Sequence, residues 1–270
     1  MKTKQAHSDS QIDFIQLYQL LDTRTIGQDF WCFKQLPSTN TLVKKLPAAL
    51  ADPGLVCVAV KQYAGRGQRQ NEWIAGKHTA LTFSVVLKPE KEQSLHMLLQ
   101  IAAYSVVTAL KKCCAVNATL KWPNDVLIGG KKACGILAEG TFKGTELERF
   151  VIGIGINTNG QLPPELSDTA VNLSGILGRD VNHTALLAAV LNEFDEQYNR
   201  SRVDLKQQLL EINRMHRGYG QLNRVRVENK VLEGSFKFLG IDLGGYPVFL
   251  DESDSVRRFT KQDVRFEPLD

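Results

Sequence analysis

The sequence predicts an α+β fold, with a mixed or antiparallel sheet that carries helices on one side, followed by a small β-barrel. Between about residues 30 and 217, several strand-like apolar runs follow one another without a helix between them. A strictly alternating parallel sheet would not allow this. Long amphipathic stretches with helical spacing interrupt these runs, and after Gly218 the chain changes to short strands separated by turn residues.

The apolar pattern places each element of the larger region. The expected strands are FWCFKQL (30–36), LVCVAV (55–60), ALTFSVVL (80–87), ATLKW (118–122), VLIGG (126–130), ACGILAEG (133–140) and RFVIGIGIN (149–157). The expected helices span residues 39–50, 94–113, 184–200 and 204–217. Residues 1–29 hold at most one short helix, around IQLYQLL, which is too little for a helix-turn-helix domain.

Residues 218–270 form a second region, so the predicted domains are 1–217 and 218–270. Four or five short strands in this segment predict a small barrel that is marginal alone and packs on the larger domain. The segment has eight Lys and Arg against nine Asp and Glu, a formal charge of −1. A nucleic-acid module needs a basic face, so this charge favours a docking role without DNA binding.

Composition excludes several classes of protein. A chain of 270 residues with 43% hydrophobic and 23% charged residues is an ordinary globular mix, not a disordered or fibrous one. A formal charge of +4 is too small to mark a dedicated nucleic-acid binder.

The five cysteines lack C-x-x-C spacing and predict reduced, buried thiols. Without an apolar signal core or a run of about 20 apolar residues, we expect a cytoplasmic protein.

The stretch KQYAGRGQRQNEW (61–73) is the most unusual in the chain. It combines two glycines with two arginines, Arg66 and Arg69, whose guanidinium groups repel each other unless an anion or water lies between them. A solvated surface loop is the ordinary interpretation, and half of an anion site is the alternative. The glycines match neither the dinucleotide fingerprint nor a P-loop.

Two further stretches have both a structural and a functional interpretation. PSTN (37–40) precedes an apolar-periodic run, which predicts a helix N-cap, and its polar side chains could also form a pocket wall. VIGIGINTN (151–159) places two glycines in a core-like strand. A β-bulge or the close approach of a ligand would explain them.

The fourth stretch, KWPNDVLIGGKKACGILAEG (121–140), reads as a strand, a turn and a hairpin closed by Gly129 and Gly130. This structural interpretation leaves Lys131 and Lys132 unexplained, because two adjacent cations enter an otherwise apolar strand. Side chains alternate between the faces of a strand, so one lysine points inward or into a cleft. It requires an anion there, since a buried unpaired charge is costly.

Together the four stretches resemble the biotin protein ligases, which activate biotin with ATP and transfer it to a lysine of a carrier protein. The order STN, G-R-G-x-R-x-x-x-W, K-W-P-N-D with K-K-x-x-G-I-L-x-E, and G-x-G-I-N carries the resemblance over residues 36–160, and the tail follows it more loosely. The resemblance implies the class II synthetase-like fold of the biotin and lipoate ligase superfamily with an SH3-like C-terminal barrel. It also implies ATP, Mg²⁺, biotin and a biotin carboxyl carrier domain of a carboxylase as ligands and partner.

The resemblance assigns roles residue by residue. Its catalytic residues would be Lys132, Arg66 and Lys121. Its biotin-binding residues would be Ser38, Thr39, Asn40, Gln62, Arg66, Gly67, Gln68, Trp73, Lys132, Gly135, Gly153 and Gly155. Its ATP-binding residues would be Arg66, Arg69, Lys121, Asn124 and Asn157, and the sequence identifies no metal ligands.

The chain departs from the family pattern in two places. Many members read G-R-G-R-R-G where this chain has Gln68 and Gln70, so one cation and one hinge are missing. The effect of this difference on how tightly the adenylate is held stays open. An N-terminal DNA-binding region is missing too, which predicts a ligase that binds neither DNA nor membrane, with homodimerisation left open. A lipoate or octanoyl ligase of the same superfamily and a non-enzymatic nucleotide- or RNA-binding regulator remain as alternatives.

Overall fold

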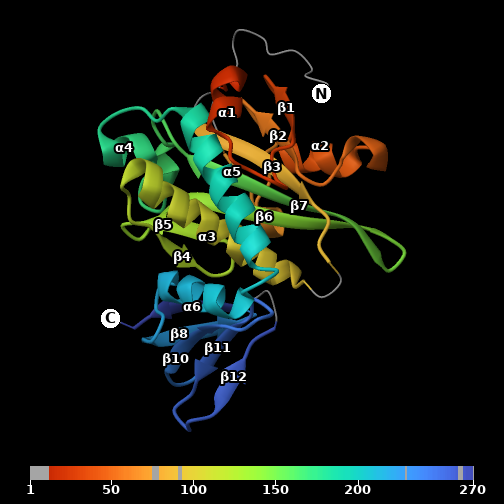
Figure 1. Cartoon of the computed structure of the whole chain (residues 1–270). Helices are drawn as coiled ribbons and strands as arrows, with labels where there is room; N and C mark the ends of the chain where they lie inside the picture. The colour runs from red at the N-terminus through yellow and green to blue at the C-terminus, as the bar shows by residue number, and fades with distance from the viewer. Residues whose placement is uncertain (1–11, 75–78, 91–92, 229, 261–263, 270) are drawn as a thin grey trace.

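The structure is a computed structural model that describes residues 12–74, 79–90, 93–228, 230–260 and 264–269. A large sheet forms the upper part of the molecule and a small curled sheet the lower part, with helix α6 (Leu205–Met215) next to the small sheet (Figure 1). The predicted N-terminal helix is α1 (Phe14–Leu20), capped by Asp13. Residues 1–11 of that predicted segment lie outside the described residues.

The large sheet has seven strands in the order β1-β2-β3-β7-β6-β5-β4. They are β1 (Asp29–Phe33), β2 (Leu55–Ala59), β3 (Ala80–Leu87), β4 (Thr119–Lys121), β5 (Asp125–Ile128), β6 (Lys131–Lys143) and β7 (Glu146–Asn157). Only the β1–β2 pair is parallel, and the other pairs are antiparallel. The predicted mixed sheet is confirmed.

One face of this sheet is covered by helices that hold the main core. Helix α3 (Leu95–Cys114) packs on α5 (His183–Arg200), and Ile152, Ile154 and Ile156 of β7 point toward them. By length and composition α3 could cross a membrane, and it is the one such helix found in the described part of the chain. Since most of it is buried inside the protein, it is the central core helix.

The opposite face carries α2 (Thr39–Lys45), so the expectation of helices on one side only was wrong. Val43 of α2 joins a second apolar cluster with Cys57, Val86 and Val151, which alternate with the residues of the main core. The predicted helix over 39–50 is also too long. Leu46 is extended because Pro47 follows it, and a separate short helix, η1 (Ala48–Leu50), comes next.

Short connections complete the large region. The hairpin between β5 and β6 turns at Gly129 and Gly130, both with positive φ, as the sequence predicted. The remaining elements are η2 (Gln68–Gln70), η3 (Pro164–Leu166) and α4 (Leu173–Leu177). The sequence patterns did not identify α4, which has only five residues.

The cysteine prediction is confirmed in part. All five thiols are free, and Cys57 and Cys134 are buried, where desolvation raises their pKa values. Cys113 is exposed, because the last turn of α3 extends past the core and contains Lys111 and Lys112. The general expectation that the cysteines are buried was therefore wrong for Cys113.

The C-terminal strands form an antiparallel sheet whose curled form is consistent with the predicted small barrel (Figure 1). They are β8 (Leu222–Val227), β9 (Lys230–Val231), β10 (Phe236–Ile241), β11 (Pro247–Leu250), β12 (Val256–Arg258) and β13 (Val264–Pro268). Residues 229, 261–263 and 270 of the predicted barrel segment lie outside the described residues. Phe238 stacks closely against Phe249 and Phe266, with ring centroids 5.1 and 4.6 Å away.

The small sheet is attached to the larger region by buried polar and aromatic contacts. Asn213 of α6 donates to Ile241 O and accepts from Ile241 N of β10. His216 follows α6, pairs with Leu120 of β4 and packs edge-on against Phe238. Both ring nitrogens of His216 are buried without a hydrogen-bond partner, and burial lowers its pKa to about 3. It is therefore neutral in the folded protein.

Neutral His216 makes the attachment sensitive to acid. Its folded pKa lies below the unfolded value of 6.5, so its contribution to stability is complete above pH 6.5 and is lost as the pH falls toward 3. We expect the His216→Leu variant, which cannot be protonated there, to lose less stability than the parent protein between pH 7 and 4. Urea unfolding at a series of pH values measures the difference. A difference that is constant over this range would contradict the prediction.

Candidate functional site

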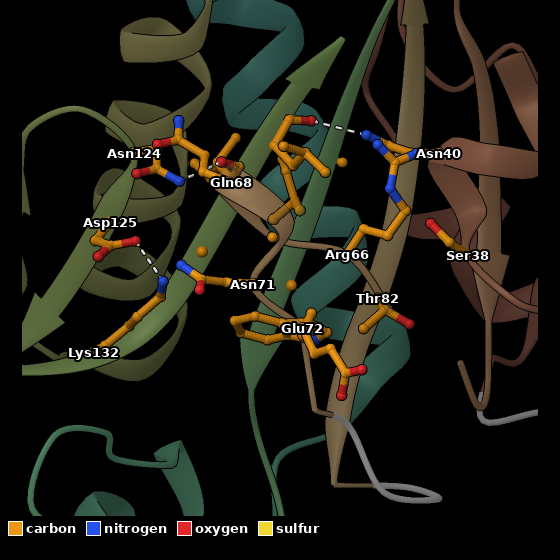
Figure 2. A pocket seen from close by; sticks show the side chains of 18 of the residues that line it. Ser38, Asn40, Arg66, Gln68, Asn71, Glu72, Thr82, Asn124, Asp125 and Lys132 are labelled. Atoms are coloured by element: carbon orange, nitrogen blue, oxygen red, sulfur yellow. Dashed lines mark hydrogen bonds and ion pairs between the residues drawn. The ribbon is translucent and has the colours of Figure 1, made fainter. Parts of the chain in front are cut away.

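A cavity of about 280 Å³, named the main cavity because most residues singled out in the sequence line it, lies on the α2 face of the large sheet. Strands β3, β6 and β7 form its floor, the start of α2 forms one wall, and the turn after β4 forms the opposite wall. Figure 2 shows Ser38 and Asn40 on one side of the cavity and Asp125 and Lys132 on the other. The loop that precedes β3 closes it from above.

Three glycines make the floor of the cavity flat, because they carry no side chains. Gly135 of β6 is paired with Gly155 of β7, and Gly153 lies two residues before Gly155 on the same face. An added Cβ at Gly153 would lie 2.3 Å from Asn40 Oδ1, and one at Gly155 would lie 2.5 Å from the ring of Trp73. The strand register is regular here, so close approach, and not a β-bulge, explains these glycines.

The polar wall is a buried hydrogen-bond network. Ser38 caps α2 as predicted, since its Oγ accepts from Thr41 N. Gln62 Oε1 accepts from the backbone N–H of Thr39 at 2.7 Å. Ser84 Oγ lies 2.6 Å from both Thr39 Oγ1 and Asn40 Oδ1. The network fixes several hydroxyl and amide groups toward the cavity before any ligand enters.

A salt-bridge cluster joins this wall to the loop. Glu139 of β6 accepts from Arg66 Nη2 at 2.8 Å, from Lys44 Nζ at 2.7 Å and from Asn40 Nδ2 at 3.1 Å. Burial opposes ionisation of Glu139, but the hydrogen bonds from Lys44, Asn40 and Arg66 outweigh it and lower its pKa. Arg66 therefore has an anionic partner in the protein itself.

Trp73 closes the cavity from the loop side. Its ring lies against Gly135 and Gly155, and its backbone N–H donates to Gly65 O at 3.0 Å. Gly67 N donates to Asn71 O at 2.7 Å, which shapes the turn between them. Trp73 Nε1 is buried without a hydrogen-bond partner in the protein. This donor is available to a ligand that has an acceptor at this position.

Lys132 is the cation at the far end of the floor. Its Nζ lies 2.6 Å from Asp125 Oδ1 and 5.9 Å from the centroid of the Trp73 ring. Lys131 points the other way, is exposed and donates to Ser167 O. One lysine of the pair therefore lies in a cleft, as predicted, and its anionic partner there is Asp125 of the protein itself. Its predicted role in binding a ligand anion stays a prediction.

The turn after β4 supplies the remaining polar groups. Asn124 Nδ2 donates to Ile136 O at 2.8 Å and holds the turn on β6. Lys121 lines the cavity and forms an ion pair with Glu267 of β13, which also lies 3.5 Å from Arg217 Nη1. A strand of the small sheet therefore meets the edge of the cavity.

Most residues singled out in the sequence line this one cavity. They are Ser38, Thr39, Asn40, Gln62, Arg66, Gly67, Gln68, Trp73, Lys121, Asn124, Lys132, Gly135, Gly153 and Gly155. Arg69 and Asn157 do not line it. Arg69 is exposed with a positive φ. Asn157 is buried and donates to Lys132 O and Val171 O, which ties β6 to the chain before α4.

Some lining residues were not predicted. Asn71 and Glu72 lie in the loop that was singled out, but both occupy unspecified (x) positions of the G-R-G-x-R-x-x-x-W motif. Thr82 faces the cavity from an apolar strand, and strand alternation could have identified it. Arg265 comes from the small sheet, and no local pattern indicates that contact.

Comparison with known proteins identifies the family. The profile of the Biotin/lipoate A/B protein ligase family matches residues 32–157. The Bifunctional ligase/repressor BirA of Bacillus subtilis is 30% identical over 250 residues, which cover 90% of this chain and 76% of that protein. The chain therefore belongs to the biotin/lipoate A/B protein ligase family. A Biotin--[acetyl-CoA-carboxylase] ligase of Mycobacterium tuberculosis is also 30% identical, over 82% of this chain and 86% of its own length.

Solved structures of the family have the same fold. The biotin protein ligase of Aquifex aeolicus, in complex with biotin and ATP, superposes with a TM-score of 0.79 at 25% identity. The match covers 90% of this chain and all of that protein. It therefore includes both the large sheet and the C-terminal strands, and it confirms the α+β fold.

The cavity fits a metal ion only as part of a nucleotide complex. In the part of the chain that the structure describes, no group of three or more His, Cys, Asp or Glu side chains could hold a metal ion. Asp125 and Glu72 are the carboxylates that line the cavity, and Asp125 is paired with Lys132. Mg²⁺ commonly binds through one or two carboxylates, water and substrate phosphates, and this set is compatible with that mode.

The flat floor predicts the effect of one added methyl group. In a Gly155→Ala variant the new Cβ collides with the Trp73 ring, so the ring leaves the floor. The strand itself tolerates alanine, because Gly155 has no positive φ. We expect acrylamide quenching of tryptophan fluorescence to rise while the unfolding midpoint changes little.

The control is the same substitution in a Trp73→Phe background, where only Trp31 and Trp122 contribute to the tryptophan fluorescence. If quenching rises there by the same amount, the signal does not come from Trp73 and the prediction fails.

Proposed function

We propose that this chain is a biotin–protein ligase that converts biotin and ATP to biotinyl-5′-AMP and transfers biotin to a lysine of a carrier protein. The observation that carries the proposal is the position of Lys132. Its ammonium group lies at one end of a glycine floor, beside the Trp73 ring and opposite the polar wall around Asn40. The ureido ring of biotin would lie against the polar wall, and its alkyl chain would carry the carboxylate along the glycine floor toward the cation.

The polar wall favours biotin over a lipoyl group. Ser38, Asn40 and Gln62 offer both donors and acceptors, which match the carbonyl and two N–H groups of a ureido ring. A dithiolane offers no such partners and would leave the buried polar groups unpaired, at a large cost in affinity. The Mycobacterium tuberculosis relative is named a Biotin--[acetyl-CoA-carboxylase] ligase and the Aquifex aeolicus structure a biotin protein ligase, so the lipoate and octanoyl alternative is not favoured.

The first chemical step joins two anions. A carboxylate oxygen of biotin attacks the α-phosphorus of ATP, and the bond to the β-phosphate breaks as pyrophosphate leaves. No acid or base is essential, so positioning and fixed positive charge supply most of the acceleration. Lys132, Arg66 and Lys121 would supply this charge, and they line the cavity together with Arg265. Mg²⁺ bound to the phosphates would neutralise further charge.

The second step needs a dry cavity until the carrier arrives. The lysine amine of the carrier attacks the carbonyl carbon of the mixed anhydride, and AMP leaves. Water would hydrolyse the same bond, so the loop over residues 61–73 acts as a lid. Arg66 and Trp73 hold it through Glu139 and the glycine floor. The anion beside Arg66 is Glu139 of the protein itself.

Other parts of the proposal concern partners and location. The carrier is a biotin carboxyl carrier domain of a biotin-dependent carboxylase, and the protein acts in the cytoplasm without binding DNA. Residues 1–217 form the catalytic domain and residues 218–270 the small domain. Homodimerisation is compatible with this function. A regulator that binds nucleotides or RNA without catalysis is distinguished by a lack of biotin-dependent exchange between ATP and pyrophosphate.

Exchange of labelled pyrophosphate into ATP tests the function directly. We expect exchange only when biotin is present, and we expect Lys132→Met to slow it by about 100-fold or more, the scale of one lost transition-state cation. Lys131→Met is the matched control, because Lys131 is adjacent, exposed and directed away from the cavity. Near-normal exchange in Lys132→Met would contradict the catalytic role of Lys132. Exchange that does not require biotin would contradict the proposed function.

Limited proteolysis tests the lid. Ordering the loop costs conformational entropy, and biotin with MgATP would add contacts to those that Arg66 and Trp73 already make with Glu139 and the glycine floor. We expect trypsin to cut after Arg66 or Arg69 in the free protein and the ligands to slow that cleavage. Arg179, exposed in the chain after α4, is the internal control whose cleavage stays constant. Equal loop cleavage with and without ligands, in active protein, rules out a ligand-dependent lid.

A further inference from the structure

Among the residues that the structure describes, Arg149 of β7 is the one lysine or arginine that is buried, with 4% of its surface exposed. Its guanidinium group donates to backbone carbonyls. Nη1 donates to Val43 O at 2.6 Å and to Leu46 O at 3.1 Å, and Nη2 also donates to Leu46 O at 3.1 Å. A buried charge is costly unless polar groups surround it, so these carbonyls account for the presence of a cation here.

The carbonyls that Arg149 contacts belong to the C-terminal end of α2. The last carbonyls of a helix lack partners in the helix itself, and Pro47 prevents α2 from continuing past Leu46. A cation at this end also interacts favourably with the helix dipole. The cap of α2 is therefore supplied by a strand of the large sheet, which ties the helix to β7.

One face of β7 meets α2 along the length of the helix. Side chains alternate along a strand, so Arg149, Val151 and Gly153 share this face. Gly153 leaves room for Asn40 at the start of α2, where an added Cβ would lie 2.3 Å from Asn40 Oδ1. Val151 lies in the second apolar cluster with Val43, in the middle of the helix. Arg149 completes the series at its end.

The cap restricts movements of α2 that apolar packing permits. The contact between Val43 and Val151 is non-directional, so it alone allows the helix to slide or turn on the sheet. Hydrogen bonds need a narrow range of distance and angle, so those of Arg149 fix the helix in one position. The hydrogen bond of Asn40 with Ser84 requires that position, because the two side chains meet at 2.6 Å.

Building on the proposed function, we propose that Arg149 is a positioning residue for biotin. It holds α2 on β7 so that the polar wall at the start of the helix keeps its spacing from the glycine floor. Arg149 does not line the main cavity, so it acts only through α2. The opposite end of the cavity is held differently, since Lys132 pairs with Asp125 and Asn124 donates to Ile136 O. The role of Arg149 is therefore confined to the biotin end.

Calorimetric titration with biotin and pyrophosphate-exchange kinetics test the proposal. Arg149→Met keeps most of the apolar part of the side chain and removes its donors. We expect it to raise the Kd and the KM for biotin about 10-fold, while kcat and the KM for ATP at saturating biotin change less than about twofold. Arg149→Lys should restore part of the affinity. Lys45→Met is the control, because it removes the same charge from the last turn of α2 at an exposed position.

The split between biotin and ATP separates positioning from a general loss of stability, which would lower kcat through loss of folded protein and leave both KM values unchanged. That result, an unchanged Kd for biotin, or an equal effect in Lys45→Met would overturn the proposal. If Arg149→Met does not fold, Arg149→Lys decides by the same criteria, with an expected rise of about threefold in the Kd for biotin.

Hydrogen exchange of the α2 amides measures the fixation of the helix without any activity. We expect faster exchange in Arg149→Met than in Lys45→Met, since only the first variant loses the cap. Equal exchange rates would show that Arg149 does not hold the helix. Failure of the proposed function is distinct, because the parent protein would then show no biotin-dependent exchange.

Discussion

The absence of side chains at Gly135, Gly153 and Gly155 is the constraint on which the whole site depends. These three residues share one face of the β6–β7 pair, and both the Trp73 ring and the Asn40 amide occupy the space that a Cβ would fill. On the other face, alternate isoleucines of β7 are buried under α3 and α5. The strand cannot move back to accommodate extra atoms, so the floor, the lid and the polar wall keep a fixed spacing.

Charge in the site is arranged as pairs that a ligand can exchange. Arg66 has Glu139, Lys132 has Asp125 and Lys121 has Glu267. Each cation is thus stabilised in the free protein, which avoids the cost of an unpaired charge in a partly buried cavity. The pairs differ in strength. Glu139 is held by three donors, while Glu267 is half-exposed, so the Lys121 pair is the weaker of the two.

The sequence alone predicts those features of the fold and the site that depend on neighbouring residues. The order of apolar runs predicts the mixed sheet, Ser38 predicts the cap of α2, and the pair Lys131 and Lys132 predicts a cation in a cleft. Local pattern failed where a distant contact determines the outcome. Asn157 ends the glycine strand as a ligand residue would, but its amide turns to backbone carbonyls beside α4. Pro47 shortened α2, and the apolar face of that helix gave no indication of which side of the sheet it covers.

The small sheet shows why a summed charge cannot exclude an anion site. Its formal charge is −1, yet strand alternation sends the apolar side chains inward and brings arginines 224, 226 and 265 to one outer face. Glu267 lies on that face too, whereas Asp251 and Asp242 lie elsewhere, each paired with an arginine of β12. What matters for an anion is the potential at the wall it approaches, which falls off within about 10 Å at ordinary salt. A sheet of negative net charge can therefore present a positive face to the cavity beside it, and in this chain that face adjoins Lys121.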